Sequence, residues 1–222
     1  MSKVSENINL IREQIQKTHK NSFFTKLPLP KLVAVSKKQE DYKVIEALEM
    51  GQKYFGENRV QEAQQRWVSK LKNYENIELR LIGPLQTNKI KQALNLFDVI
   101  ETIDREKLAN EIAIKINNDS KTKSFYIQIN TGNETQKSGI DPLQADKFIK
   151  YCKQDLKLPI VGLMCIPPSV EEPSMHFALL KKIAERNSLQ ELSMGMSNDY
   201  NEAIKFGATS VRIGSLVFGP RE

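Results

Sequence analysis

The sequence is poor in the residues that build disulfide scaffolds and metal sites. Its 222 residues include only two cysteines, Cys152 and Cys165, and two histidines, His19 and His176. Two cysteines are too few for a disulfide framework and form no CxxC pattern, so we expect both to be reduced, partly buried thiols. The histidines stand in polar surroundings without an HExxH spacing, and we therefore expect no metal site.

Long apolar segments are also missing. No run approaches the roughly 18 apolar residues that a membrane-spanning helix needs. The first residues, MSKVSENINLIREQIQK, lack the apolar core of a secretory signal. With 10 glycines and 9 prolines, the chain is neither collagen-like nor of low complexity. We expect a cytoplasmic protein that does not enter a membrane.

A strong excess of one charge is absent too. Lysine and arginine total 33 against 27 aspartates and glutamates, which gives a net charge of +6. A basic chain can bind nucleic acid, but here the cations alternate with acids, as in KKIAERNSLQE, and no basic cluster is interleaved with aromatic residues. This pattern is typical of solvated helix faces, so a nucleic-acid-binding module is the least favoured class of function.

The positive signal is a regular alternation of short apolar runs with helical patterns. Runs rich in β-branched residues predict strands, and the segments between them show capping residues and glycine stops typical of helices. The predicted strands are 32–37, 53–57, 78–83, 97–102, 124–130, 159–166, 191–197 and 210–214. The predicted helices are 6–19, 41–50, 58–71, 88–96, 104–116, 142–152, 172–186 and 199–206.

Eight strands separated by helices predict a parallel sheet, and eight such units are the number that closes a (β/α)8 barrel. We expect one domain over residues 1–222, in which residues 1–31 form an N-terminal helix and a proline-containing link. A length of 222 residues is near the lower end for this fold. An open, doubly wound sheet is the alternative, because the same local pattern also fits an unclosed sheet.

In a barrel, functional side chains lie at the carboxyl ends of the strands. Val33, Val35 and Lys37 share one parity on the first predicted strand, so Lys37 should stand above an apolar barrel interior. Burial favours the neutral, nucleophilic form of such an amine, which can attack a carbonyl to form a Schiff base. The alternative is a solvated lysine at a strand end, beside Lys38.

The last two predicted strands end in small residues. Ser197 precedes a predicted helix, and Gly214 and Ser215 follow the eighth strand. Loops after strands seven and eight are the frequent phosphate site of this fold, because exposed backbone N–H groups there favour an anion. The same residues would also serve as helix caps and a tight turn, so both interpretations stay open.

Arg212 shares the parity of Gly214 and should point into the barrel near its upper end. A buried guanidinium needs an acceptor. A ligand's ring nitrogen or phosphate would serve, and so would Glu57 or Glu101. A lysine amine, a phosphate site and an arginine at one barrel mouth together suit pyridoxal 5′-phosphate (PLP).

At this point the chain resembles the YggS/PROSC-type pyridoxal phosphate homeostasis proteins. The matching segments are LVAVSK, FGENRVQEA, LIGPLQTNK, QKSGI, GLMCIPP, SMGMSNDYNEAIKFG and TSVRIGSLVFG, which cover nearly the whole chain in order. The resemblance implies a single barrel similar to the N-terminal domain of alanine racemase. It implies that Lys37 forms the internal aldimine, that Ser197, Gly214 and Ser215 bind the phosphate, and that Arg212 faces the pyridine nitrogen. It places Asn58 near the cofactor and Met164 along its ring.

One departure from the family pattern is visible. Many members have histidine where this chain has Pro84, so no acid–base role can rest on that position. Lys137, within QKSG, is a candidate second amine near the mouth, although a loop lysine is normally solvated.

The resemblance implies PLP binding, buffering and delivery within the cell, without established turnover, and apo-enzymes as acceptors of the cofactor. Only eight residues follow Gly214, so we expect no second domain of the kind that supplies a catalytic tyrosine in racemases, and we expect a monomer. An arginine beside the ring nitrogen also disfavours carbanion chemistry. The alternatives are a PLP-dependent amino-acid racemase or lyase, and a PLP-independent Schiff-base enzyme such as an aldolase.

Overall fold

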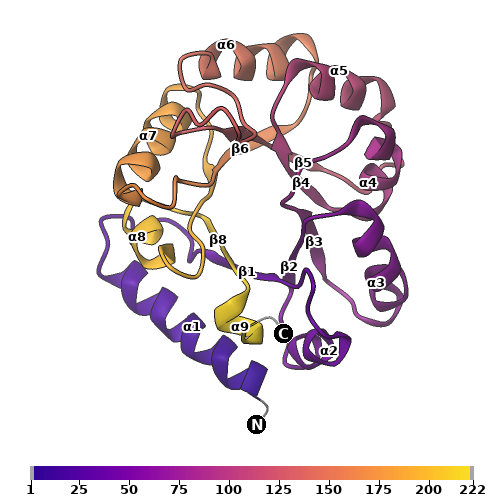
Figure 1. The fold of residues 1–222 in the computed structure, drawn as a ribbon, viewed down its shortest axis with the longest axis vertical. Coiled ribbons are helices and arrows are strands. Elements are labelled where there is room, and N and C mark those ends of the chain that lie inside the picture. The colour runs from indigo at the N-terminus through magenta and orange to yellow at the C-terminus, as the bar shows by residue number, and fades with distance from the viewer. Residues whose placement is uncertain (1–2, 221–222) are drawn as a thin grey trace.

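The computed structural model describes residues 3–220. Eight parallel strands form a closed barrel in chain order, and β8 closes the ring by pairing with β1 (Figure 1). Closure confirms the predicted barrel and excludes the open sheet. The strands are β1 (Lys31–Val35), β2 (Tyr54–Glu57), β3 (Glu78–Leu81), β4 (Val99–Ile103), β5 (Ser124–Ile129), β6 (Ile160–Cys165), β7 (Glu191–Ser193) and β8 (Ser210–Ile213).

Helices surround the barrel as an outer ring (Figure 1). All eight predicted helices are present, with ends that differ by a few residues from the predicted ones. They are α1 (Lys3–Lys20), α2 (Asp41–Glu49), α3 (Val60–Asn73), α4 (Ile90–Leu96), α5 (Glu106–Lys115), α6 (Ala145–Lys150), α7 (Pro173–Arg186) and α8 (Tyr200–Lys205). Two short segments that overlap the predicted helices 88–96 and 142–152 form separate elements, η1 (Thr87–Lys89) and the π-helical η2 (Tyr151–Asp155). The short helix α9 (Ser215–Phe218) was not predicted.

The N-terminal helix α1 completes this outer ring. It packs against α2, α8 and α9 (Figure 1). Its buried side chains recur at helical spacing, with Ile8, Ile11 and Ile15 on the face toward the barrel. The amide of Asn7 donates to the carbonyl of Val217 in α9 at 3.0 Å. The short helix α9 and the N-terminal helix α1 thus both lie between α8 and α2.

Most strands end earlier than the sequence predicts, and the differences in β1 and β7 shape the upper end of the barrel. β1 ends at Val35, so Lys37 lies in the turn after the strand. β7 ends at Ser193 because Gly195 has a φ of +91°, which turns the chain away from the sheet. A Cβ at Gly195 would lie 2.6 Å from the Cβ of Ala203, so this close approach also needs glycine.

Both cysteines are free thiols, as expected, but both are fully buried rather than partly buried. Burial raises the pKa of the Cys152 thiol and of the Cys165 thiol to about 12, so neither is a thiolate near neutral pH. Within residues 3–220 no helix is both long and apolar enough to cross a membrane. The same part of the chain has no group of three or more His, Cys, Asp or Glu side chains that could hold a metal ion.

Candidate functional site

A pocket of about 170 Å³ opens at the carboxyl ends of the strands. It brings together six of the seven side chains or backbone positions that the sequence singled out, from both ends of the chain. The lining residues are Val35, Lys37, Asn58, Ile82, Ile166, Met196, Ser197, Arg212, Gly214 and Ser215. The rule that function lies at strand ends therefore selected residues that meet in space.

Lys37 lines this pocket and is partly buried. Val35, two residues before it, also lines the pocket, as the shared parity predicted. The next residue, Lys38, is exposed and has a φ of +56°, so the chain turns sharply after Lys37. The two neighbouring lysines thus have different surroundings, and only Lys37 of the two is among the pocket's lining residues.

A cluster behind the barrel wall holds the turn that carries Lys37. The guanidinium of Arg66, from α3, donates to the backbone carbonyls of Ser36 and Gln39, the latter at 2.6 Å. Glu57 is fully buried and accepts from the Ser36 hydroxyl at 2.7 Å and from the Trp67 indole at 3.1 Å. The residues on both sides of Lys37 are therefore tied to α3 and β2, which limits the positions that the lysine backbone can adopt.

The opposite wall of the pocket comes from the loops after β7 and β8. The Ser215 hydroxyl donates to the Ser197 hydroxyl at 3.1 Å, so the two loops meet at this pair. A Cβ at Gly214 would lie 3.3 Å from the Val35 carbonyl oxygen, which is tighter than ordinary packing. Glycine there lets the end of β8 approach the end of β1 beside Lys37.

Arg212 enters the pocket from β8 and is only 4% exposed. Its Nη1 donates to the Ser193 hydroxyl at 2.7 Å and its Nη2 to the Cys165 carbonyl at 2.8 Å. Among the residues that the structure describes, neither of the glutamates considered from the sequence bonds to it directly. Glu57 bonds to Trp67 of α3, outside the barrel, and Glu101 is linked to Arg212 through the Ser193 hydroxyl.

Met164 is the predicted site residue that the structure does not bring to the pocket lining. It is fully buried on β6, in a cluster with Val99 and Tyr126. The residue from this part of the chain that lines the pocket is Ile166, just after the strand. Ile166 and Ile82 were missed because the sequence does not show how far each strand extends toward the pocket, although both stand at strand ends.

Two further positions that the sequence raised, Lys137 and Pro84, are not among the residues that line this pocket. Lys137 forms an ion pair with Glu134 at 2.5 Å and donates to the Pro167 carbonyl at 3.2 Å, so it is tied to its own loop and to the loop after β6. Pro84 lines a neighbouring pocket, which Asn58 also lines.

The pocket lining combines several donors with a few apolar side chains. Lys37 and Arg212 supply cationic groups, and Ser197, Ser215 and Asn58 supply hydroxyl and amide donors. Within the described residues, the lining contains no carboxylate. Valine, isoleucine and methionine side chains provide apolar surface. Such a lining suits a small anion that also has apolar surface and an electrophilic group with which a lysine amine can react.

Known proteins with similar sequences and structures point to one family. Residues 3–222 match the family model "Alanine racemase, N-terminal domain". The pyridoxal phosphate homeostasis protein of Vibrio cholerae is 34% identical over 236 residues, which cover 100% of this chain and 98% of that protein. PipY of Synechococcus elongatus, solved with and without PLP, is 30% identical over 97% of this chain and 100% of its own, with TM-scores of 0.82 and 0.85.

A more distant likeness concerns the fold alone. Alanine racemase of Corynebacterium glutamicum aligns with 99% of this chain and 61% of its own, at a TM-score of 0.69 and 14% identity. The barrel is therefore the architecture of the racemase N-terminal domain. The family model, the curated relatives and PipY together show that the chain belongs to the pyridoxal phosphate homeostasis protein family.

Proposed function

We propose that this protein binds PLP through Lys37 and serves as an intracellular reserve and donor of the cofactor. When bound, PLP supplies an aldehyde that condenses with a primary amine, with loss of water, and the reverse reaction releases it. The observation that carries the proposal is the meeting of Lys37, Arg212 and the Ser197–Ser215 pair in one pocket without a carboxylate. The PLP-bound structure of the relative PipY supports the same ligand.

Each group in the pocket has a part in this proposal. Lys37 would form the covalent bond, and Ser197, Gly214 and Ser215 would bind the phosphate through hydroxyl and backbone N–H donors. Arg212 would hold the ring nitrogen, and because a guanidinium does not give up its proton, it would keep that nitrogen unprotonated. Asn58 would stand beside the cofactor. Met164, buried behind Ile166, would support the wall next to the ring.

The finer parts of the proposal concern the setting in which the protein acts. We expect a cytoplasmic monomer in which the single barrel carries the whole binding function. Its partners would be PLP and apo-enzymes that accept the cofactor, with no role for nucleic acid or membranes. A lysine-bound aldehyde is suited to this role because a competing amine, on a small molecule or on an acceptor enzyme, can displace the lysine.

Absorption spectroscopy with chemical trapping tests the proposal. Adding PLP to the purified protein should produce a visible absorption band that borohydride removes, and peptide mapping should then find the reduced adduct on Lys37. Amino acids should show no exchange of the α-hydrogen with solvent, which separates binding from racemase or lyase activity. If the spectrum stays unchanged and no peptide carries the adduct, the protein does not hold PLP in this way.

The Arg66 cluster leads to a second prediction about the same pocket. Replacing Arg66 with methionine removes the donors to the Ser36 and Gln39 carbonyls, so the turn that carries Lys37 becomes less ordered. We expect PLP binding about tenfold weaker, the loss typical of one or two hydrogen bonds to a charged group. Titration followed by absorbance measures this, with Arg59→Met, an exposed arginine of the neighbouring loop, as control.

A further inference from the structure

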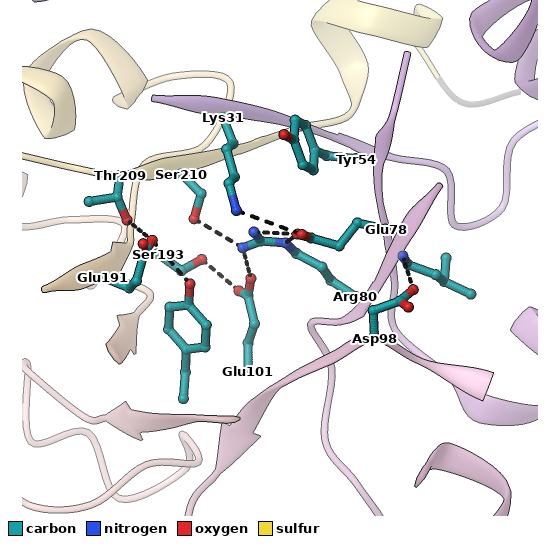
Figure 2. Close-up of polar contacts among 12 residues, drawn as sticks. Lys31, Tyr54, Glu78, Arg80, Asp98, Glu101, Glu191, Ser193, Thr209 and Ser210 are labelled. Carbon is teal, nitrogen blue, oxygen red and sulfur yellow. Dashed lines mark hydrogen bonds and ion pairs between the residues drawn. The ribbon is translucent and has the colours of Figure 1, made fainter. Parts of the chain in front are cut away.

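A chain of buried polar groups crosses the interior of the barrel below the pocket (Figure 2). At its centre is Arg80 of β3, whose side chain is 1% exposed. It pairs with Glu101 of β4 at 2.8 Å and with Glu78, at the lower rim, at 2.5 Å. Burial alone would lower the pKa of Arg80, but the negative charges around it raise that pKa above its ordinary value. Arg80 is therefore a cation that fixes the Glu101 carboxylate opposite it.

Ser193 links this pair to the pocket. Its hydroxyl donates to the second oxygen of Glu101 at 2.5 Å and accepts from Nη1 of Arg212 at 2.7 Å. A guanidinium can only donate and a carboxylate can only accept, so the single hydroxyl proton must point to Glu101. The serine lone pairs then face Arg212. All four groups, from Arg80 to Arg212, are buried, so water does not compete for these bonds.

The bonds to Arg212 fix its plane. Ser193 holds one terminal nitrogen and the Cys165 carbonyl holds the other, on two different strands, β7 and β6. Two hydrogen bonds at separate nitrogens determine the orientation of a planar guanidinium. Arg212 is also one of the residues that line the pocket. The orientation of its guanidinium at the pocket thus depends on where Ser193 stands, and Glu101 holds the Ser193 hydroxyl.

We propose that Glu101, acting through Ser193, is a positioning residue for Arg212, and that this relay sets how the arginine meets its ligand. The proposal deepens the proposed function and rests on it for the identity of the ligand. The relay itself is a property of the protein without ligand. A purely structural role for the buried serine and glutamate is the competing account, and it predicts that their loss lowers stability without moving Arg212.

The structure offers a matched pair of variants. Ser193 and Ser210 are both fully buried, and they pair in register across β7 and β8. The Ser210 hydroxyl accepts a long bond from Arg80, at 3.3 Å (Figure 2). Within the described residues, the hydrogen bonds of the Arg212 side chain go to Ser193 and Cys165 and not to Ser210. Ser193→Ala therefore cuts the relay next to Arg212, whereas Ser210→Ala removes a buried hydroxyl of the same kind without cutting it. Ser193→Thr keeps the hydroxyl, so the Arg212 guanidinium should keep its wild-type position in this variant.

Crystal structures of the ligand-free variants test the relay directly. In Ser193→Ala we expect the Arg212 guanidinium to leave its position against the Cys165 carbonyl, and in Ser210→Ala we expect it to stay. Glu101→Gln should displace Arg212 in the same way. An amide nitrogen that faces Ser193 cannot accept the hydrogen bond of the serine hydroxyl, so the hydroxyl is no longer held in place for Arg212. An Arg212 that keeps its place in Ser193→Ala, or that moves equally in Ser210→Ala, overturns the proposal.

Binding of PLP gives a second, independent readout. For Ser193→Ala we expect PLP to dissociate about tenfold faster and its visible absorption maximum to shift, while Ser210→Ala matches the wild type in both. Thermal unfolding shows whether each variant is folded. Failure of the proposed function would appear in the wild type, as absence of a Lys37 adduct. Failure of the relay would appear as wild-type dissociation and spectrum in Ser193→Ala.

Discussion

Lys37→Ala is expected to abolish covalent capture of PLP. The amine that condenses with the aldehyde is lost, while the remaining pocket donors, Arg212, Ser197 and Ser215, stay in place. Noncovalent binding through these donors should remain, weaker by about 100-fold, which corresponds to roughly 3 kcal/mol. Borohydride reduction followed by mass spectrometry of the intact chain measures the captured fraction, and equilibrium dialysis measures the residual affinity.

Lys38→Ala is the control for this experiment. Lys38 is the next residue and also a lysine, but it is exposed and is not among the residues that line the pocket. We expect it to capture PLP as the wild type does. Capture by Lys37→Ala at the wild-type level, or recovery of the adduct on Lys38 or Lys137 in the wild type, would contradict the assignment of Lys37.

The sequence predicted the architecture because each strand and helix carries its own local signal. Apolar runs of five to eight residues marked all eight strands, and closure followed from their number. The same local signals led to the pocket, since Lys37, Asn58 and Arg212 each stand at or next to a strand end. Backbone turns were harder to locate. The early end of β7 depends on the left-handed conformation of Gly195, and the presence of a glycine in the sequence does not by itself predict that conformation.

The features of the site that could not be predicted from the sequence depend on how the strands are staggered in the closed barrel. Parity shows that a side chain points inward but not how high it stands along the barrel axis. The family resemblance placed Met164 along the ring, whereas Ile166, two residues further along the chain, is the one that lines the pocket. The contact between Glu101 and Ser193 joins residues 92 positions apart in the sequence, on β4 and β7, and becomes visible only when the barrel is closed.

Replacing Arg80 with methionine is expected to have the largest effect on stability. The methionine fills much of the same space, but Glu101, which is fully buried, loses the cation opposite it. Removing one partner of a buried ion pair costs about 3–5 kcal/mol, because the remaining charge stays in a medium of low polarity. For a chain of this length, that corresponds to a fall in the melting temperature of roughly 10 °C. Urea and thermal unfolding, followed by circular dichroism, measure both quantities.

Arg186→Met separates the effect of burial from that of losing an ion pair. Arg186 pairs with Asp146 at the same distance of 2.8 Å as Arg80 with Glu101, but the two side chains are 47% and 54% exposed. Exposed pairs contribute at most about 1 kcal/mol, so this variant should stay close to the wild type. The double variant Arg80→Met/Glu101→Gln should recover part of the stability lost in Arg80→Met, since no unpaired charge is left. If Arg80→Met and Arg186→Met lower the free energy of unfolding equally, Arg80 does not balance a buried charge. The interior network would then not stabilise the barrel through its ion pair.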